Sequence, residues 1–287
     1  MRNVIITGGN SGLGFETAKK IAKTSAEYNL ILACRSVQKG EEAKDSIVKE
    51  SGNKNVSVMK LDTSSLDSVR QFVADYENAD YGKIYALLCN AGISGKQSGL
   101  TQDGFDIVFE TNHLGHFLLT NLLLPHIEDD GLIFATSSDM HDSPMKKMEW
   151  TGTEALSHPA DSFAKDSVRY SYSKLCNLYF VYELAEHLKA QGKNIKVNAF
   201  NPGLMKTNFM PLNKTSMTFV KMTMPDRYGD LEKSSDAYAK LVTQEGLVKE
   251  SGLYYDRSIN AKKSSALSYS EENRKELWEK SLEYCGI

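Results

Sequence analysis

The stretch "TGGNSGLG", residues 7–14, decides how the rest of the chain is interpreted. It follows a short apolar run at residues 3–7 and precedes a segment with helical periodicity, "FETAKKIAKT" at residues 15–24. A strand that passes through glycines into a helix is typical of the start of a βαβ unit. The glycine-rich segment is therefore a candidate phosphate-binding turn.

The glycines of this turn have different physical roles. Gly8 and Gly12 allow the backbone to turn tightly and to approach a pyrophosphate, and Gly14 lets the helix close against the strand. Amides at the start of the helix would then face the phosphates, aided by the helix dipole. An ordinary loop capped by Ser11 is the alternative, but the place of the turn after the first strand of an alternating chain favours a dinucleotide site. The turn residues predicted to contact the cofactor are Gly8, Asn10, Ser11, Gly12, Leu13 and Gly14.

Short β-rich runs alternate with helix-length segments along the chain. Further strands are predicted at residues 30–34, 56–61, 84–89, 132–136, 195–200 and 252–256, and a long helix at about 104–126. Nearly continuous apolar strands between helices indicate a parallel sheet that is covered on both faces. We therefore expect one α/β domain over residues 1–287, a doubly wound Rossmann-type fold with a mostly parallel, seven-stranded sheet flanked by helices.

Two long segments interrupt the alternation, at residues 139–167 and 204–230. Both follow predicted strands, so both belong at the carboxyl edge of the sheet, where ligands bind in such folds. Methionines are frequent in the second segment and could form an adaptable apolar lid, although core packing explains some of them. They are Met205, Met210, Met217, Met222 and Met224. We expect these loops to shape a site for a lipophilic substrate.

The composition argues against several classes of partner. The chain of 287 residues is 41% hydrophobic and 25% charged, and its formal net charge of −3 gives no support to binding of nucleic acid or an anionic membrane. The cysteines are scattered, as expected of free thiols in a reducing compartment. With so few residues before the first predicted strand, we expect no signal peptide, and the longest apolar stretch, residues 117–125, is too short to span a bilayer. A cytoplasmic protein without an integral membrane segment is expected.

The end of the second predicted strand indicates which nicotinamide nucleotide binds. An acidic residue there would hydrogen-bond the ribose hydroxyls of NAD, but this chain has "ACRS" at residues 33–36. No carboxylate there would repel a 2′-phosphate, and the planar guanidinium of Arg35 can bind such a phosphate. Lys39, one helical turn onward, could assist. A solvated Arg35 is the alternative. NADP(H) is the predicted cofactor.

The stretch "VRYSYSK", residues 168–174, holds two tyrosines and a lysine. Lys174 lies one helical turn after Tyr170, so the two side chains share a helix face, whereas Tyr172 points elsewhere. A neighbouring ammonium and the positive ring of oxidised nicotinamide would lower the phenol pKa from its ordinary value of about 10. Such a tyrosine can donate a proton to a carbonyl or remove one from an alcohol. Packing alone is the alternative for both tyrosines, and it is favoured for Tyr172.

Over almost its entire length the chain resembles the short-chain dehydrogenase/reductase family. The motifs that carry the resemblance are "TGGNSGLG" at residues 7–14, "LD" at 61–62, "NAG" at 90–92, "TNHLGHF" at 111–117, "SS" at 137–138, "YSYSK" at 170–174 and "NPG" at 201–203. Within the family, "LACR", "NHLGHF" and "YSYSKLCNL" look most like the branch of retinol dehydrogenases and light-dependent protochlorophyllide reductases.

This resemblance implies roles for further residues. Ser138 would hydrogen-bond the reacting oxygen and hold it against Tyr170, Ser137 is less suited to that role, and Asn112 would anchor a water relay behind Lys174. The implied catalytic residues are Asn112, Ser138, Tyr170 and Lys174. Beyond the glycine turn and Arg35, the implied cofactor contacts are Asp62, Thr63, Asn90, Ala91, Gly92, Tyr170, Lys174, Pro202, Gly203 and Thr207.

The predicted function is that of an NADP-dependent oxidoreductase, which transfers hydride between nicotinamide and a carbonyl or alcohol, with Tyr170 as general acid/base. Light-driven reduction of a tetrapyrrole double bond is one alternative. The protochlorophyllide reductases have a "PGC" motif after the sixth strand, however, and this chain has Leu204 in the place of its cysteine, the proton donor. A non-catalytic dinucleotide sensor is another, although Tyr170 and Lys174 are retained. A monomer and a homodimer both stay open.

The histidines do not predict a metal site. His113 and His116 are spaced i,i+3 on a predicted helix, but no third ligand accompanies them, so packing or hydrogen bonding is expected. His141 follows Ser138 closely, and both an auxiliary polar role and a surface position are open for it.

Overall fold

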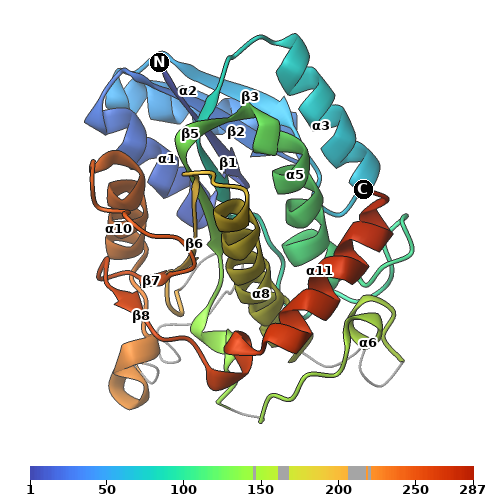
Figure 1. Ribbon diagram of the computed structural model, residues 1–287. Helices are drawn as coiled ribbons and strands as arrows, with labels where there is room; N and C mark the ends of the chain where they lie inside the picture. Colours follow the sequence, from blue (N-terminus) through green and yellow to red (C-terminus); the bar gives the residue numbers. More distant parts are fainter. Residues whose placement is uncertain (145–146, 161–167, 206–217, 219–220) are drawn as a thin grey trace.

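The computed structural model describes residues 1–144, 147–160, 168–205, 218 and 221–287. At its centre is one sheet with the strand order β3-β2-β1-β4-β5-β6-β7-β8 (Figure 1). The strands are β1 (Arg2–Thr7), β2 (Tyr28–Cys34), β3 (Val56–Lys60), β4 (Ile84–Cys89), β5 (Ile127–Thr136), β6 (Lys196–Asn201), β7 (Tyr254–Asp256) and β8 (Ala261–Lys262). All neighbours are parallel except β7 and β8. The doubly wound Rossmann-type fold predicted from the sequence is confirmed.

Helices cover both faces of the sheet because its strands are apolar on both sides. Every residue of β2 is buried, and so is every residue of β4 except Tyr85. The helices on one face are α1 (Gly12–Thr24), α2 (Val37–Ser51) and α10 (Leu231–Thr243). Those on the other face are α3 (Leu66–Asn78), α5 (Gly115–Leu123) and α8 (Val168–Ala190), and α11 (Glu271–Cys285) packs against α8 and α5.

In the described part of the chain the sheet has eight strands, where the sequence predicts seven. The additional strand, β8, is two residues long and exposed, so no apolar alternation marks it in the sequence. The helix α11 is also absent from the predicted elements. Few of its residues are buried, namely Leu277, Ser281 and Cys285, which leaves only a weak apolar pattern.

The long helix predicted at about residues 104–126 is a series of shorter helical segments. The three-residue helix α4 (Ile107–Phe109) leads into a π-helical segment, Glu110–Leu114, which continues into α5 and ends in a 3₁₀ turn, Leu124–His126. Asp106 begins the series by accepting hydrogen bonds from the next amides, at 3.0 Å each. A π-helical segment widens the helix locally and is frequent at functional sites. This segment carries Asn112, and all of its residues are buried.

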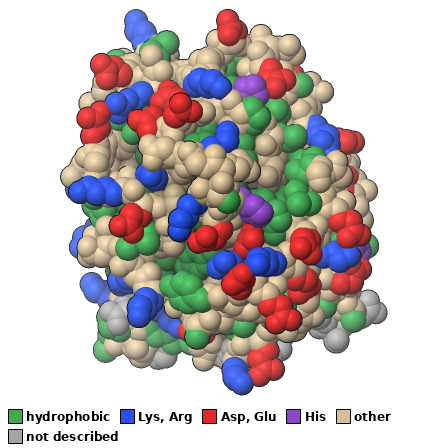
Figure 2. All heavy atoms as spheres, in the orientation of Figure 1, with side chains coloured by type: hydrophobic (Ala, Val, Ile, Leu, Met, Phe, Trp, Pro, Cys, Tyr) green, Lys and Arg blue, Asp and Glu red, His purple; other side chains and the backbone are tan. Residues whose placement is uncertain are grey.

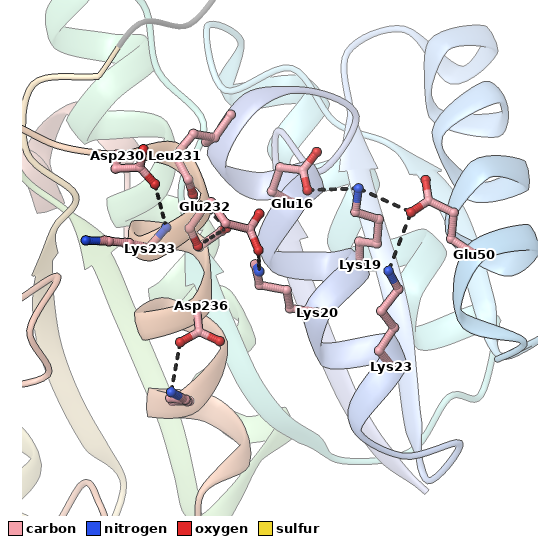
Figure 3. Close-up of polar contacts among 12 residues, drawn as sticks. Glu16, Lys19, Lys20, Lys23, Glu50, Asp230, Leu231, Glu232, Lys233 and Asp236 are labelled. Atoms are coloured by element: carbon pink, nitrogen blue, oxygen red, sulfur yellow. Dashed lines mark hydrogen bonds and ion pairs between the residues drawn. The ribbon is translucent and has the colours of Figure 1, made fainter.

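Charged side chains link α1 to the helices beside it. Figure 3 shows Lys20 of α1 bonded to Glu232 of α10, and Lys19 and Lys23 of α1 directed toward Glu50 of α2. Surface pairs of this kind contribute at most about 1 kcal/mol each. Burial of apolar helix faces therefore accounts for most of the attachment of α10, which begins directly after the second irregular segment.

Charge is mixed over the surface that Figure 2 displays. Basic and acidic side chains are interspersed on this face of the molecule, without a large patch of one sign. Within the described part of the chain, no helix combines the length and the apolar character that crossing a membrane requires.

Gly115→Ala tests how closely α5 approaches the loop after β3. A Cβ at Gly115 would lie 2.1 Å from the Thr63 carbonyl oxygen, a main-chain atom that cannot rotate away. We expect the free energy of unfolding, measured by urea denaturation, to fall by about 1–3 kcal/mol. Gly40→Ala is the matched control and should cost less, because the atoms nearest to its Cβ belong to the Val58 side chain, with Cγ1 at 2.5 Å, and not to the main chain. A Gly115→Ala protein as stable as the wild type would contradict the close approach.

Candidate active site

A cleft of about 380 Å³ opens at the carboxyl edge of the sheet, past the ends of β1 to β6. Ligands bind at this edge in doubly wound folds. The predicted site residues that line it are Gly8, Asn10, Ser11, Gly12, Leu13, Arg35, Asp62, Thr63, Asn90, Ala91, Gly92, Ser138, Tyr170, Lys174, Pro202 and Gly203. Gly14 and Asn112 are not part of the lining, and Thr207 lies outside the described residues.

The glycine turn has a backbone that residues with a Cβ rarely adopt. The φ angle is 66° at Gly8 and 56° at Gly12. A Cβ at Gly14 would lie 2.7 Å from the Gly8 carbonyl oxygen, so the helix could not approach the turn this closely with a side chain there. The Ser11 side chain makes no capping hydrogen bond, which argues against an ordinary capped loop. The geometry suits a phosphate group at the start of α1.

Thr7 joins the glycine turn to the floor of the cleft. Its hydroxyl oxygen accepts hydrogen bonds from the amides of Asn90 at 2.8 Å and Ala91 at 2.9 Å. The Asn90 side-chain amide donates to the Thr7 carbonyl oxygen at 2.9 Å. Nε2 of His116 lies 2.9 Å from the same Thr7 hydroxyl. These bonds set the distance between the ends of β1 and β4, where a nucleotide would lie.

The part of the cleft beside β2 is basic. Arg35 and Lys39 are exposed side chains that line it, and Lys60 of β3 donates a hydrogen bond to the Arg35 carbonyl oxygen. Asp62 is the only carboxylate among the described residues of the lining, and it accepts a hydrogen bond from the Ser64 hydroxyl at 2.6 Å. This end of the cleft therefore has the charge that an added phosphate requires.

Three hydrogen bonds hold α8 over the end of β5. Nζ of Lys174 donates to the Thr136 carbonyl oxygen at 2.8 Å, and the Asn177 side-chain amide donates to the same oxygen at 3.1 Å. The Ser137 hydroxyl donates to the Lys174 carbonyl oxygen at 2.9 Å. Ser137 is thus engaged with the helix backbone, which leaves Ser138 as the serine that can serve a substrate.

Ser138 lies beside Tyr170 in the cleft. A hydrogen bond with Ser138 acts on the phenol of Tyr170, and Nζ of Lys174 lies 5.6 Å from the centroid of the Tyr170 ring. The Ser138 oxygen also accepts a hydrogen bond from the Met140 amide at 3.2 Å, at the start of the 3₁₀ turn Asp139–His141. The structure therefore brings together three of the four residues with an implied catalytic role.

Burial sets the Tyr170 pKa in the protein without a nucleotide, and the lowering expected beside Lys174 and an oxidised nicotinamide stays a prediction. Burial raises the Tyr170 pKa to about 12, although the hydrogen bond with Ser138 opposes the rise. Burial also lowers the pKa of Lys174 to about 8, so this ammonium group loses its proton more readily than that of an exposed lysine. Desolvation outweighs the proximity of the lysine, which does not bond the phenol but the Thr136 carbonyl. The phenol is protonated at neutral pH, the form that can donate a proton.

Asn112, the fourth of these residues, lies behind the cleft floor in the π-helical segment. Its side-chain oxygen accepts from the Ile93 amide at 2.7 Å, and its side-chain nitrogen donates to the Ile93 carbonyl oxygen at 3.0 Å and to the Ser173 hydroxyl at 2.9 Å. The Asn112 side chain therefore ties the floor to α8. Its main-chain carbonyl oxygen lies 3.3 Å from Nδ1 of His116. A water relay at Asn112 stays a prediction.

The histidines of the π-helical region pack and bond, as predicted. His113 and His116 are buried, and Nε2 of His113 lies 3.1 Å from the Ser281 hydroxyl of α11. Burial lowers the pKa of His113 to about 3 and that of His116 to about 4. No cluster of metal-ligating side chains is found among the described residues.

The structure also shows where other residues named in the sequence analysis lie. Tyr172 is a core residue whose hydroxyl donates to the Glu149 carbonyl oxygen at 2.7 Å, so packing holds for it. A surface position for His141 is wrong, because its side chain is buried. Of the methionines expected in a lid, Met205 lines the cleft and Met222 is exposed. Met210 and Met217 lie outside the described residues.

Some lining residues were not identified from the sequence. They include Thr7, Leu61, Ile93, Thr111 and Thr136. A signal for Thr7 and Thr136 exists, since each is the last residue of a strand at the ligand-binding edge. Ile93 and Thr111 depend on how the π-helical segment lies against the floor, which no local pattern indicates.

Comparison with known proteins agrees with this geometry. Residues 2–150 match the family model for short chain dehydrogenases. Human retinol dehydrogenase 13 is 32% identical over 296 residues, which cover 100% of this chain and 85% of that protein. Human polyprenol dehydrogenase is 29% identical over 299 residues, with 100% and 86% covered.

A solved structure extends the likeness to the whole fold. The crystal structure of an uncharacterized protein from Mycobacterium Paratuberculosis, 28% identical, has a TM-score of 0.74 and covers 100% of this chain and 94% of that one. The relatives of this chain are thus named as dehydrogenases. The chain itself has the glycine turn, the cleft floor at Asn90–Gly92 and the group Ser138, Tyr170 and Lys174. The chain belongs to the short-chain dehydrogenase family and is an oxidoreductase that acts on alcohol or carbonyl groups.

Proposed function

We propose that this protein is an NADP-dependent oxidoreductase that interconverts a lipophilic alcohol and its carbonyl compound, with Tyr170 as the proton donor and acceptor. One observation carries the proposal. A single cleft is lined by the glycine turn, by Arg35 and by Ser138, Tyr170 and Lys174. A dinucleotide that spans the cleft would have its phosphates at one end and its reacting ring at the other.

The residues of the cleft fit such a nucleotide. The turn leaves no room for a Cβ at Gly14, and Ser11 leaves the start of α1 uncapped, so the pyrophosphate would lie there. Arg35 and Lys39 would hold the 2′-phosphate, and no carboxylate ends β2 to oppose it. The other contacts proposed are Asp62, Thr63, Asn90, Ala91, Gly92, Pro202, Gly203 and Thr207. When bound, the nicotinamide supplies or accepts the hydride.

The side chains of the cleft supply the proton chemistry. In the direction of reduction, the carbonyl oxygen takes the proton of the Tyr170 hydroxyl while the carbonyl carbon gains the hydride. Ser138 donates a hydrogen bond to the same oxygen and favours the charge that develops on it. Protonated Lys174 and the Ser138 hydroxyl then stabilise the Tyr170 phenolate until a proton returns from solvent. In the direction of oxidation the phenolate removes the proton of the alcohol.

Apolar side chains in the lining of the cleft support an apolar substrate. Ile93, Leu204 and Met205 line the cleft next to Gly92 and Gly203. Relatives that resemble the chain over its full length are named for retinol and polyprenol, both lipophilic alcohols. We propose a substrate of this physical class, with a primary or secondary alcohol or the matching carbonyl as the reacting group.

Tyr170→Phe removes the proton donor and keeps the ring. We expect NADPH to bind with unchanged Kd and turnover to fall by at least about 100-fold, because general acid–base catalysis contributes on this order. NADPH oxidation is followed with a panel of lipophilic aldehydes and ketones. Tyr172→Phe, on the same helix, is the matched control and should keep kcat, since its hydroxyl bonds the Glu149 carbonyl oxygen and the residue is not part of the cleft lining. Turnover retained in Tyr170→Phe would remove the proposed role.

Arg35→Ala tests the choice of nucleotide. Loss of a charge-assisted contact to a 2′-phosphate should lower kcat/KM for NADPH about 10-fold to 100-fold, and kcat/KM for NADH should stay near the wild-type value. The measurement compares both nucleotides with one carbonyl substrate. A wild-type protein that prefers NADH, or an equal loss with both nucleotides, would refute the preference for NADP.

A further inference from the structure

The ring of His141 bridges the turn after Ser138 and a distant part of the chain. Nδ1 of His141 lies 2.7 Å from the Ser138 carbonyl oxygen, and the Ser265 amide donates to Nε2 of His141 at 3.0 Å. The side chain is buried. Ser265 precedes the 3₁₀ turn Ala266–Tyr269, just before α11. Residues 124 positions apart therefore meet through this ring.

The partners determine the tautomer of His141. A carbonyl oxygen can only accept, so Nδ1 carries the proton, and an amide can only donate, so Nε2 carries none. A protonated imidazole would direct a second N–H at the Ser265 amide, donor against donor. Burial lowers the pKa of His141 from its usual value in agreement with this geometry, while the Ser138 carbonyl opposes the shift. The ring is neutral and has one defined orientation.

The remaining groups around His141 come from its own turn and from two other places. Asp139 and Asp142 lie on the same turn and favour the protonated ring, whereas Arg227, from the second irregular segment, disfavours it. Arg227 donates to the carbonyl oxygens of Asp139 and Asp142, at 3.1 Å each. The Tyr254 ring of β7 lies edge-on to the imidazole, with centroids 5.3 Å apart. The turn after Ser138 is thus held from outside by several elements, and His141 bonds the carbonyl of Ser138 itself.

We propose that His141 is a positioning residue, which keeps Ser138 in the orientation that serves the reacting oxygen and couples it to the segment before α11. This inference rests on the proposed function for its effect on turnover. The Ser138 hydroxyl and carbonyl belong to one residue, and the carbonyl oxygen also accepts from the His141 main-chain amide at 3.0 Å. Loss of the ring bond therefore leaves one of two hydrogen bonds on this carbonyl and lets the Ser138 hydroxyl shift relative to Tyr170. A ring that only filled space would not require either of its nitrogens.

Two conservative variants separate the two bonds of the ring. The side-chain amide of His141→Asn places an N–H near the position of Nδ1 and keeps the bond to Ser138. The longer His141→Gln places an acceptor near Nε2 and keeps the bond to Ser265. His141→Ala keeps neither. All three should bind NADPH with the wild-type Kd, because the nucleotide contacts do not include this residue.

Steady-state kinetics and hydrogen exchange then test the inference separately. We expect kcat for carbonyl reduction to fall about tenfold in His141→Ala and His141→Gln, the value of about one hydrogen bond, and to be restored largely in His141→Asn. Backbone amides of residues 137–142 should exchange faster in the Ala and Gln proteins and near the wild-type rate in the Asn protein. The exchange readout needs no substrate, so it decides the positioning role even if the proposed reaction fails.

The pH profile is a further readout of this kind. As the pH falls below the ordinary range of histidine, protonation breaks the bond to Ser265 but leaves the Nδ1 proton bonded to the Ser138 carbonyl oxygen. The wild type and the Asn protein should therefore have the same pH profile of kcat. Equal kcat and equal exchange in all three variants and the wild type would overturn the proposal. Losses that follow the stability of each variant, regardless of which nitrogen is replaced, would overturn it as well.

Discussion

The site depends on the attachment of α8 to the end of β5. Lys174 and Asn177 both donate to the Thr136 carbonyl oxygen, and Ser137 donates to the backbone of the helix. Because Tyr170 lies one helical turn before Lys174, these bonds also set the phenol next to Ser138. Folding alone therefore holds the side chains proposed to react in place, so the proposed reaction would not have to order them.

The electrostatics of the cleft follow from burial as much as from neighbouring charges. Desolvation raises the pKa of Tyr170 and lowers that of Lys174. A protonated phenol suits the donation of a proton to a carbonyl, which is the step proposed for the direction of reduction. Oxidation of an alcohol requires the phenolate, which a positively charged oxidised nicotinamide would favour. Polar bonds such as that of His141 to Ser138 then decide how the hydroxyls face each other.

Much of this architecture could be predicted from the sequence, for physical reasons that differ between residues. The glycine turn is local, and the spacing of Tyr170 and Lys174 on a helix is a matter of period alone. Ser138 and Asn90 follow strands, so the parallel sheet brings them to one edge. The π-helical segment at Asn112, the orientation of His141 and the strand β8 depend on contacts between residues far apart in the chain. The Tyr170 pKa could not be predicted, because desolvation is set by the folded surroundings.

The position of a bound nucleotide tests the account most directly. The measurement is a crystal structure of the protein with NADPH. The account predicts the 2′-phosphate against Arg35, the pyrophosphate at the glycine turn, and nicotinamide C4 facing the hydroxyls of Ser138 and Tyr170, with room for a carbonyl about 3–3.5 Å from the reacting atoms. A nucleotide bound in the reverse direction, or a nicotinamide remote from the Tyr170 hydroxyl, would contradict it.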